Sequence, residues 1–180
     1  HSRTDFDLSS HQKLSGRKIQ YFDNERNESY VPFVVETSIG LDRMFLSVLT
    51  NAFKEEEVPN AKGGTAIRSV LNIHPSLAPV KAAILPLVKK DGLPEASRAI
   101  LNELKYELNC FYEDKDTIGK RYRRQDAVGT PFCITVDHQT LEDDTVTLRN
   151  RDTMEQERVN KASLLKKIKN ETSIERLLKS

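Results

Sequence analysis

Three polar side chains that lie close together in the sequence can do chemistry as a group: Glu36, Ser38 and Arg43. Glu36 ends an apolar run that predicts a buried strand, and Ser38 lies in the small-residue turn that follows. Arg43 lies in the first turn of a helix predicted over residues 41–53, close to Gly40. A helix N-terminus with a guanidinium group attracts anions, and a carboxylate accepts hydrogen bonds from an ammonium group. The segment therefore predicts a site for a cationic amine beside a polyphosphate.

That pair of ligands suits amino-acid activation, and the segment resembles a known motif. Motif 3 of the class II aminoacyl-tRNA synthetases, in the form that glycyl-tRNA synthetases carry, is similar to Val34-Val35-Glu36-Thr37-Ser38-Ile39-Gly40-Leu41-Asp42-Arg43. Thr37 stands where the family pattern has proline, which leaves the polar groups unchanged. The stretch from Ser2 to His11 resembles the segment before motif 3 in this family. The blocks 119–126 and 145–152 resemble its C-terminal anticodon-binding domain.

The resemblance implies a role for each residue of the motif. A glycine substrate would be bound by Glu36, Thr37, Ser38, Ile39 and Gly40, with Glu36 receiving the ammonium group. ATP would be bound by Gly40, Leu41, Asp42 and Arg43. Arg43 would be the catalytic residue, because a fixed guanidinium stabilises charge that shifts on the phosphates. Asp42 has an alternative role, which is only to complement the helix N-terminus.

Basic residues form local clusters in a chain whose net charge is only +1. From the resemblance and the clustering we expect six of them to contact tRNA: Lys120, Arg121, Arg123, Arg124, Arg149 and Arg151. The alternative is a solvated helix face. Four histidines and two cysteines lack metal-ligand spacing, so no metal site is predicted, and Cys133 in its apolar run is expected to be a buried thiol.

The second part of the chain alternates strand and helix patterns, which predicts an α/β layer fold. The expected elements are a buried strand within 78–88, a helix from Pro94, a short strand at 110–112, a helix capped by Asp116 and ended by Gly129, strands at 131–137 and 145–149 joined by a polar loop, a strand at 155–159, and a helix capped by Asn160. The resemblance implies a mixed five-stranded sheet flanked by three helices, which agrees with this pattern.

Three regions follow from these patterns. Residues 1–54 would be the C-terminal end of a class II catalytic domain, a strand–helix remnant that includes motif 3. Residues 55–76, with a charge run, a proline and paired glycines, would be a linker or insertion. Residues 77–180 would be the anticodon-binding domain.

The resemblance implies the C-terminal portion of a glycine–tRNA ligase, which activates glycine with ATP and Mg²⁺ and transfers it to tRNA(Gly). Motifs 1 and 2 have no counterpart here, so we expect the chain alone to be inactive. The complete enzyme would be a homodimer, and the absence of a long apolar run or signal-peptide core indicates a cytoplasmic protein. The alternatives are a related class II synthetase for proline, threonine or histidine, and a non-catalytic nucleic-acid-binding paralogue.

Overall fold

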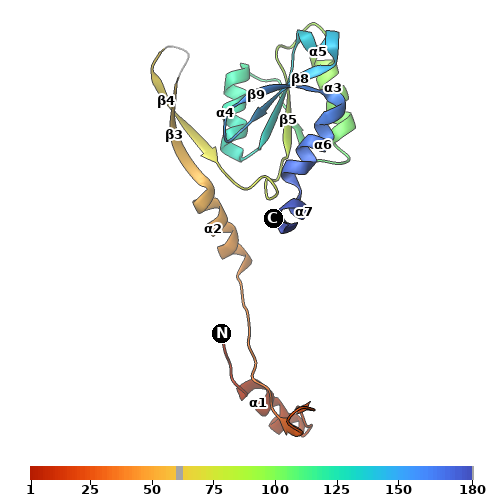
Figure 1. The fold of residues 1–180 in the computed structure, drawn as a ribbon. Helices are drawn as coiled ribbons and strands as arrows, with labels where there is room; N and C mark the ends of the chain where they lie inside the picture. Colours follow the sequence, from red (N-terminus) through yellow and green to blue (C-terminus); the bar gives the residue numbers. More distant parts are fainter. Residues whose placement is uncertain (60–62, 180) are drawn as a thin grey trace. The chain divides into compact units, whose positions relative to one another are not determined.

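The computed structural model describes residues 1–59 and 63–179, which form two compact units, His1–Phe45 and Leu46–Ser180 (Figure 1). Among the described residues, no helix is long and apolar enough to cross a membrane.

The first unit is small and mostly exposed. Helix α1 (Phe6–Ser15) ends at Gly16, whose φ of 67° gives the left-handed C-cap that glycine favours. A two-stranded antiparallel hairpin follows, made of β1 (Tyr21–Asp23) and β2 (Glu28–Tyr30). The unit ends in the first residues of helix α2 (Leu41–Ala52), which matches the helix predicted over 41–53.

The prediction of a buried strand before Glu36 is wrong for this structure. Among the described residues, Val34 and Val35 pair only with residues 2–4, through an isolated bridge between Ser2 and Val35 and through bonds that join the Val34 N–H and carbonyl to Thr4 and Arg3, at 2.8 and 3.0 Å. Val35 is 76% exposed. A strand is buried by partner strands and by a covering layer, and no second layer covers this segment among the described residues of its unit.

The second unit contains a five-stranded mixed sheet in the order β6-β5-β7-β8-β9. Strands β5 (Ala82–Pro86), β6 (Cys110–Tyr112) and β7 (Phe132–Val136) are parallel. Strands β8 (Thr145–Asn150) and β9 (Gln156–Asn160) continue the sheet antiparallel. The mixed five-stranded α/β fold that the sequence predicts is therefore confirmed.

Helices cover both faces of this sheet (Figure 1). Helices α3 (Leu93–Leu104) and α6 (Lys161–Thr172) pack on one face, where the main apolar core includes Ile84, Ile134 and Leu164. Helix α4 (Ile118–Val128) covers the other face, where Ala83, Leu85 and Cys133 lie beneath it. These are the three helices that were expected to flank the sheet. The short helix α7 (Ile174–Lys179) follows α6.

Some of the residues predicted to begin or end helices do so in the structure, and one does not. Gly129 ends α4 with φ 85°, and the Asn160 side chain accepts a bond from the Ala162 N–H at the start of α6, as predicted. Thr117, not Asp116, occupies the N-cap position of α4, because Asp116 has a left-handed backbone (φ 67°) one residue earlier. The polar loop expected between β7 and β8 contains helix α5 (His138–Asp143), which Asp137 caps.

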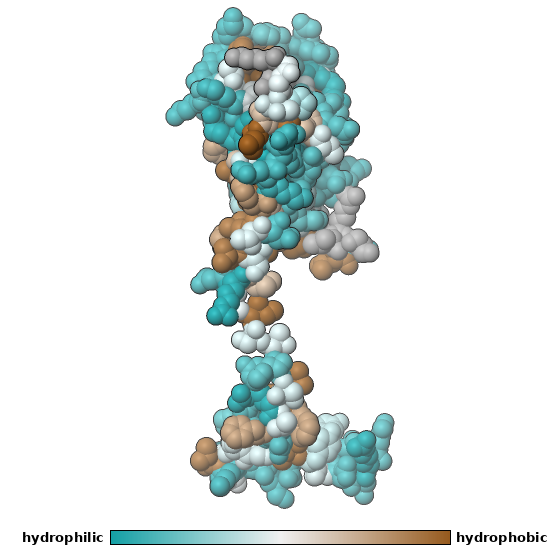
Figure 2. All heavy atoms as spheres, turned by 90° about the vertical axis from the view of Figure 1, so that its left-hand side faces the viewer, coloured by the Kyte–Doolittle hydropathy of each residue, from teal (hydrophilic) through white to brown (hydrophobic). Residues whose placement is uncertain are grey.

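Strands β3 (Phe53–Pro59) and β4 (Thr65–Leu71) form an antiparallel pair, which we call the β3–β4 hairpin. The linker or insertion predicted over 55–76 is therefore largely regular structure, although its residues 60–62 lie outside the described residues. The charged run Glu55–Glu57 lies in β3, opposite Ile67, Arg68 and Ser69 of β4. Figure 2 shows apolar side chains exposed along α2, in agreement with the exposure of Met44, Phe45 and Leu46.

Candidate functional site

The motif segment lies entirely within the first unit and is exposed. The Glu36 N–H donates to the His1 carbonyl at 3.0 Å, and its carboxylate lies 4.0 Å from the Arg3 guanidinium. Arg3 is held more tightly by Asp7, at 2.5 and 2.7 Å. The carboxylate of Glu36 is therefore more than half exposed and weakly paired, which leaves it able to accept bonds from an added amine.

The start of α2 brings the predicted phosphate-binding groups together. The Gly40 carbonyl accepts the first helical bond, from the Met44 N–H at 3.0 Å. The Arg43 side chain lies over Gly40, since a Cβ added there would meet only Arg43 carbons, at 3.9 Å. Among the described residues, neither Ser38, Asp42 nor Arg43 has a side-chain hydrogen bond or ion pair. The helix N-terminus, the glycine and the guanidinium thus form one open, cationic corner.

A second candidate site follows from the topology of the sheet. From β5 the chain passes through α3 to β6, which lies on one side of β5 in the sheet. From β6 it passes through α4 to β7, which lies on the other side of β5. The C-terminal ends of β5, β6 and β7 therefore meet at a point where the connections diverge, which is where open α/β sheets bind ligands. The sequence alone did not predict this location, because it depends on strand order.

Side chains beside the ends of β5 and β6 form a strand-end surface, which we define as Lys89, Tyr112, Asp114 and Lys115 together with Arg98 of α3. The guanidinium of Arg98 lies 4.6 Å from the centre of the Tyr112 ring. The Tyr112 hydroxyl donates to Asp114 at 3.2 Å, and Lys89 pairs with Asp114 at 3.3 Å. An aromatic ring, cations and a carboxylate at one place can stack a base, bind phosphate and read a base edge.

The ionisation of this surface follows from its contacts. Desolvation raises the pKa of Asp114, but hydrogen bonds from Lys89 and Tyr112 outweigh it and the pKa falls below its usual range. Desolvation and the nearby Asp114 raise the pKa of the Tyr112 phenol. At neutral pH the surface therefore presents a carboxylate acceptor beside a neutral phenol.

The six residues predicted to contact tRNA divide into two sets in the structure. Lys120, Arg123 and Arg124 lie on the outside of α4, with side chains 69%, 42% and 41% exposed. Arg124 is paired with Glu113 at 2.6 Å and with Asp116 at 2.9 Å, and the hydrogen bond from Arg124 lowers the pKa of Asp116. These three cations can reach a phosphate.

The other three, Arg121, Arg149 and Arg151, are buried and bonded to protein atoms. Arg121 donates to the carbonyls of Pro86 and Leu87, which ties the end of β5 to the loop after it. Arg149 and Arg151 belong to a buried polar cluster described below. Side chains without surface exposure cannot touch RNA in this conformation, so the expectation of RNA contact does not extend to them here.

The cysteine prediction is confirmed, since Cys133 is a free thiol buried beneath α4. Burial raises the pKa of Cys133 to about 12 and that of Cys110 to about 11, so neither is a nucleophile near neutral pH. The described residues include no group of three or more His, Cys, Asp or Glu placed to hold a metal ion.

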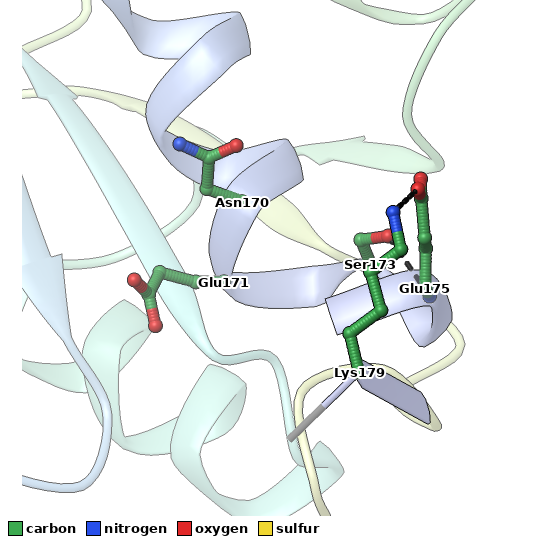
Figure 3. A pocket seen from close by; sticks show the side chains of 5 residues that line it. All are labelled: Asn170, Glu171, Ser173, Glu175 and Lys179. Atoms are coloured by element: carbon green, nitrogen blue, oxygen red, sulfur yellow. Dashed lines mark hydrogen bonds and ion pairs between the residues drawn. The ribbon is translucent and has the colours of Figure 1, made fainter. Parts of the chain in front are cut away.

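A cavity of about 590 Å³ lies elsewhere, at the junction of α6 and α7 (Figure 3). Ser173, Glu175 and Lys179 lie together on one side of it, with Lys179 paired to Glu175, while Asn170 and Glu171 project from α6 (Figure 3). None of its described lining residues is a predicted site residue.

Comparison with known proteins identifies relatives of nearly the whole chain. It is 49% identical over 172 residues to a glycine–tRNA ligase of Treponema denticola, covering 95% of this chain and 38% of the relative. It is 55% identical over 157 residues to that of Clostridium beijerinckii (87% and 33%), and 52% identical over 160 residues to that of Chlorobaculum tepidum (89% and 33%). The chain thus spans about a third of the length of these curated relatives.

Among solved structures, the RNA binding domain of threonyl-tRNA synthetase from Cryptosporidium parvum Iowa II matches with a TM-score of 0.48 and 23% identity, covering 52% of this chain and 24% of that chain. A family model described as an anticodon binding domain matches residues 81–171, which include the whole five-stranded sheet with α3, α4 and most of α6. The chain therefore belongs to the anticodon-binding domain family.

Proposed function

We propose that the chain is the part of a glycine–tRNA ligase that joins motif 3 to the anticodon-binding domain. The observation that carries the proposal is the 49% identity to a glycine–tRNA ligase over 172 residues. That alignment leaves out only eight of the 180 residues, so it extends well beyond the matched domain at 81–171. The proposed reaction is activation of glycine with ATP, followed by transfer of the glycyl group to tRNA(Gly).

In this proposal the open corner at the start of α2 binds the small substrates. Glu36 accepts the glycine ammonium group, and the backbone and side chains from Thr37 to Gly40 surround the rest of the amino acid. The phosphates of ATP lie against residues 40–43. Arg43 stabilises their charge, since a guanidinium fixed at a helix N-terminus costs no reorganisation during the reaction.

Mg²⁺ is assigned no protein ligand in this proposal, because the described residues offer no cluster of metal-binding side chains. Residues outside this chain would complete the catalytic site, so the chain alone is expected to be inactive. A homodimer and a cytoplasmic location remain predictions from the family resemblance.

For tRNA, the proposal separates phosphate contacts from base contacts. Lys120, Arg123 and Arg124 contact phosphates, because they are the exposed members of the predicted basic cluster. Tyr112 and Arg98 of the strand-end surface offer stacking faces for unpaired bases, and Asp114 is a carboxylate that can accept from the amino group of cytosine. Phosphate contacts position the RNA and base contacts give specificity.

The catalytic half of the proposal is tested with Arg43→Ala in the protein that carries this chain. Glycine-dependent exchange between ATP and pyrophosphate should fall at least 100-fold, as when one preorganised donor is removed from a reacting charge. Arg17→Ala, at another exposed arginine of the first unit, is the control and should leave exchange unchanged. Exchange that is faster with proline or threonine than with glycine would contradict the assignment.

The RNA half is tested by titrating the 180-residue chain with a glycine tRNA transcript and with a copy whose anticodon is changed. Tyr112→Ala should reduce the preference for the glycine anticodon. Lys120→Ala should lower the affinity for both RNAs by the same factor and reduce the salt dependence of binding. Lys105→Ala, on the outside of the α3 end, is the matched control. Equal affinity for both RNAs at every salt concentration would show that the chain does not read the anticodon.

A further inference from the structure

The β3–β4 hairpin lies outside the matched domain, yet buried charges join the two. Asp126 of α4 is fully buried and accepts three hydrogen bonds. Arg68 of β4 donates one from Nε at 2.9 Å, and Arg149 of β8 donates two, at 2.7 and 3.0 Å. One carboxylate thus connects the hairpin, the helix and the sheet.

Arg68 has partners for its other nitrogens as well. It is 1% exposed, and it donates to the Glu56 carboxylate on β3 at 3.0 Å and to the carbonyl of Arg151. Both strands of the hairpin therefore take part in the cluster. The register supports this, because Glu56 is the residue directly opposite Arg68.

A second contact fixes the chain that leaves the hairpin. Arg151 donates to the Gly129 carbonyl and to the Ile73 carbonyl, both at 2.8 Å. Gly129 is in turn packed so closely that an added Cβ would lie 3.0 Å from Ile73 Cγ2 and 3.1 Å from the Leu71 carbonyl oxygen. The end of β4 and the end of α4 are in direct backbone contact.

A two-stranded hairpin is marginally stable by itself, so its order has to come from what it packs against. The apolar cover is small: Val58 and Val70 are buried, and a minor core of Ala52, Ile73 and Ala78 lies at its base. Buried ion pairs fix a unique geometry, because a displaced partner would leave a charge unpaired in the interior. The polar cluster therefore adds directional contacts between the hairpin and the sheet to this small apolar cover.

We propose that Arg68 and Asp126 make the β3–β4 hairpin and the anticodon-binding domain one cooperative unit, so that RNA bound to the domain also stabilises the hairpin and the end of α2. The RNA-dependent part rests on the proposed function. Helix α2 runs without a break from Leu41 to Ala52, and β3 follows it directly. Asp126 and Arg68 are thus positioning residues, through which tRNA binding acts on the helix that carries Arg43.

The first test needs no RNA. Native-state hydrogen exchange of the 180-residue chain in low urea reports which amides open together. In the wild type, amides of β4 and β7 should share one opening reaction with one urea dependence. In Arg68→Met, which leaves the Asp126–Arg149 pair intact, the β4 amides should open at least tenfold more often than those of β7. Asp126→Asn also removes the counter-ion of Arg149 in the sheet, so opening of β7 should increase in this variant as well.

Asp137→Asn is the matched control, because Asp137 forms a similar two-bond pair with Arg158, at 2.6 and 2.9 Å, that does not involve the hairpin. It should change the opening of β4 and β7 equally. Independent opening of β4 in the wild type, or β4 and β7 that still open together in Arg68→Met, would overturn the proposal.

The second test adds a glycine tRNA transcript at about 100 times its dissociation constant, which slows exchange of a whole cooperative unit about 100-fold. In the wild type both β4 and β7 should slow by this factor, and in Arg68→Met only β7 should. Slowing of β7 alone in the wild type would refute the coupling. Slowing of neither would refute RNA binding, and with it the proposed function, while the urea experiment still decides the coupling.

Discussion

The most direct test of the buried cluster is Asp126→Asn. The substitution keeps the shape of the side chain and removes only its charge and one acceptor. In the structure the carboxylate accepts from Arg68 at 2.9 Å and from Arg149 at 2.7 and 3.0 Å, and no part of it reaches solvent. The variant would therefore leave two buried guanidinium groups short of a counter-ion.

Removing one partner of a buried ion pair costs about 3–5 kcal/mol. Arg68 keeps Glu56, which is partly exposed, whereas Arg149 keeps the face of the Tyr122 ring, 4.8 Å away, and the neighbouring Cys133 thiol, neither of which is a carboxylate counter-ion. The expected loss therefore lies in this range and falls mainly on Arg149. A domain of this size loses roughly 2–4 °C of Tm for each kcal/mol, so Tm should fall by about 6–20 °C.

Urea unfolding of the whole chain, followed by amide signals of β7, measures this loss in the second unit without interference from the first. Asp137→Asn is the comparison, because asparagine caps a helix as well as aspartate and the pair with Arg158 is partly exposed, so about 1 kcal/mol is expected. If Asp126→Asn costs no more than Asp137→Asn, the buried guanidinium groups do not depend on Asp126 and the reasoning fails.

Gly129→Ala should lower the free energy of unfolding by more than about 2 kcal/mol, because the added Cβ meets Ile73 at 3.0 Å and the backbone is also strained at φ 85°. Gly92→Ala is the control: at φ 79°, with nothing within 4 Å of the added Cβ, it should cost only the backbone strain of about 1 kcal/mol. The hydrogen bond from Arg158 lowers the folded-state pKa of Asp137, so its stabilisation is present above the unfolded pKa of ~4 and is lost as pH falls through the folded pKa. In Asp137→Asn, the free energy of unfolding measured in urea should therefore fall less steeply as the pH drops below about 4. Cys133, whose pKa burial raises to about 12, should resist iodoacetamide at pH 8 until urea unfolds the sheet, as mass spectrometry would show.

Features that depend on neighbouring residues were predicted from the sequence. Gly129 and Asn160 end and begin helices through bonds to residues only a few positions away, and the structure confirms both. The strands of the sheet were found because their apolar runs are buried whatever covers them. Asp116 was misassigned by one residue, since a cap depends on backbone angles that several polar residues in a row satisfy equally well.

Features that depend on distant partners were not predicted. The segment with β3 and β4 was predicted as a linker or insertion, because the partners of its charged strand lie far away in the sequence: Arg68 is twelve residues from Glu56, and Asp126 is 58 residues from Arg68. The strand before Glu36 was expected to be buried, because a run of valines indicates burial but not the layer that provides it. The strand-end surface depends on the order of strands in the sheet.

The arginines show why charge patterns in a sequence give only an upper limit on RNA contact. Arginine presents five donors and pairs with carboxylates and carbonyls as readily as with phosphates, so a basic cluster is equally compatible with an interior network. In this structure Arg121 and Arg149 are buried and bonded to protein atoms, and Arg124 on the surface is already paired with Glu113 and Asp116. A phosphate that binds Arg124 must replace a carboxylate, so little net charge pairing is gained. Binding by this face should be weak and salt-sensitive, and specificity must come from contacts other than charge, for which the strand ends offer an aromatic ring and a carboxylate.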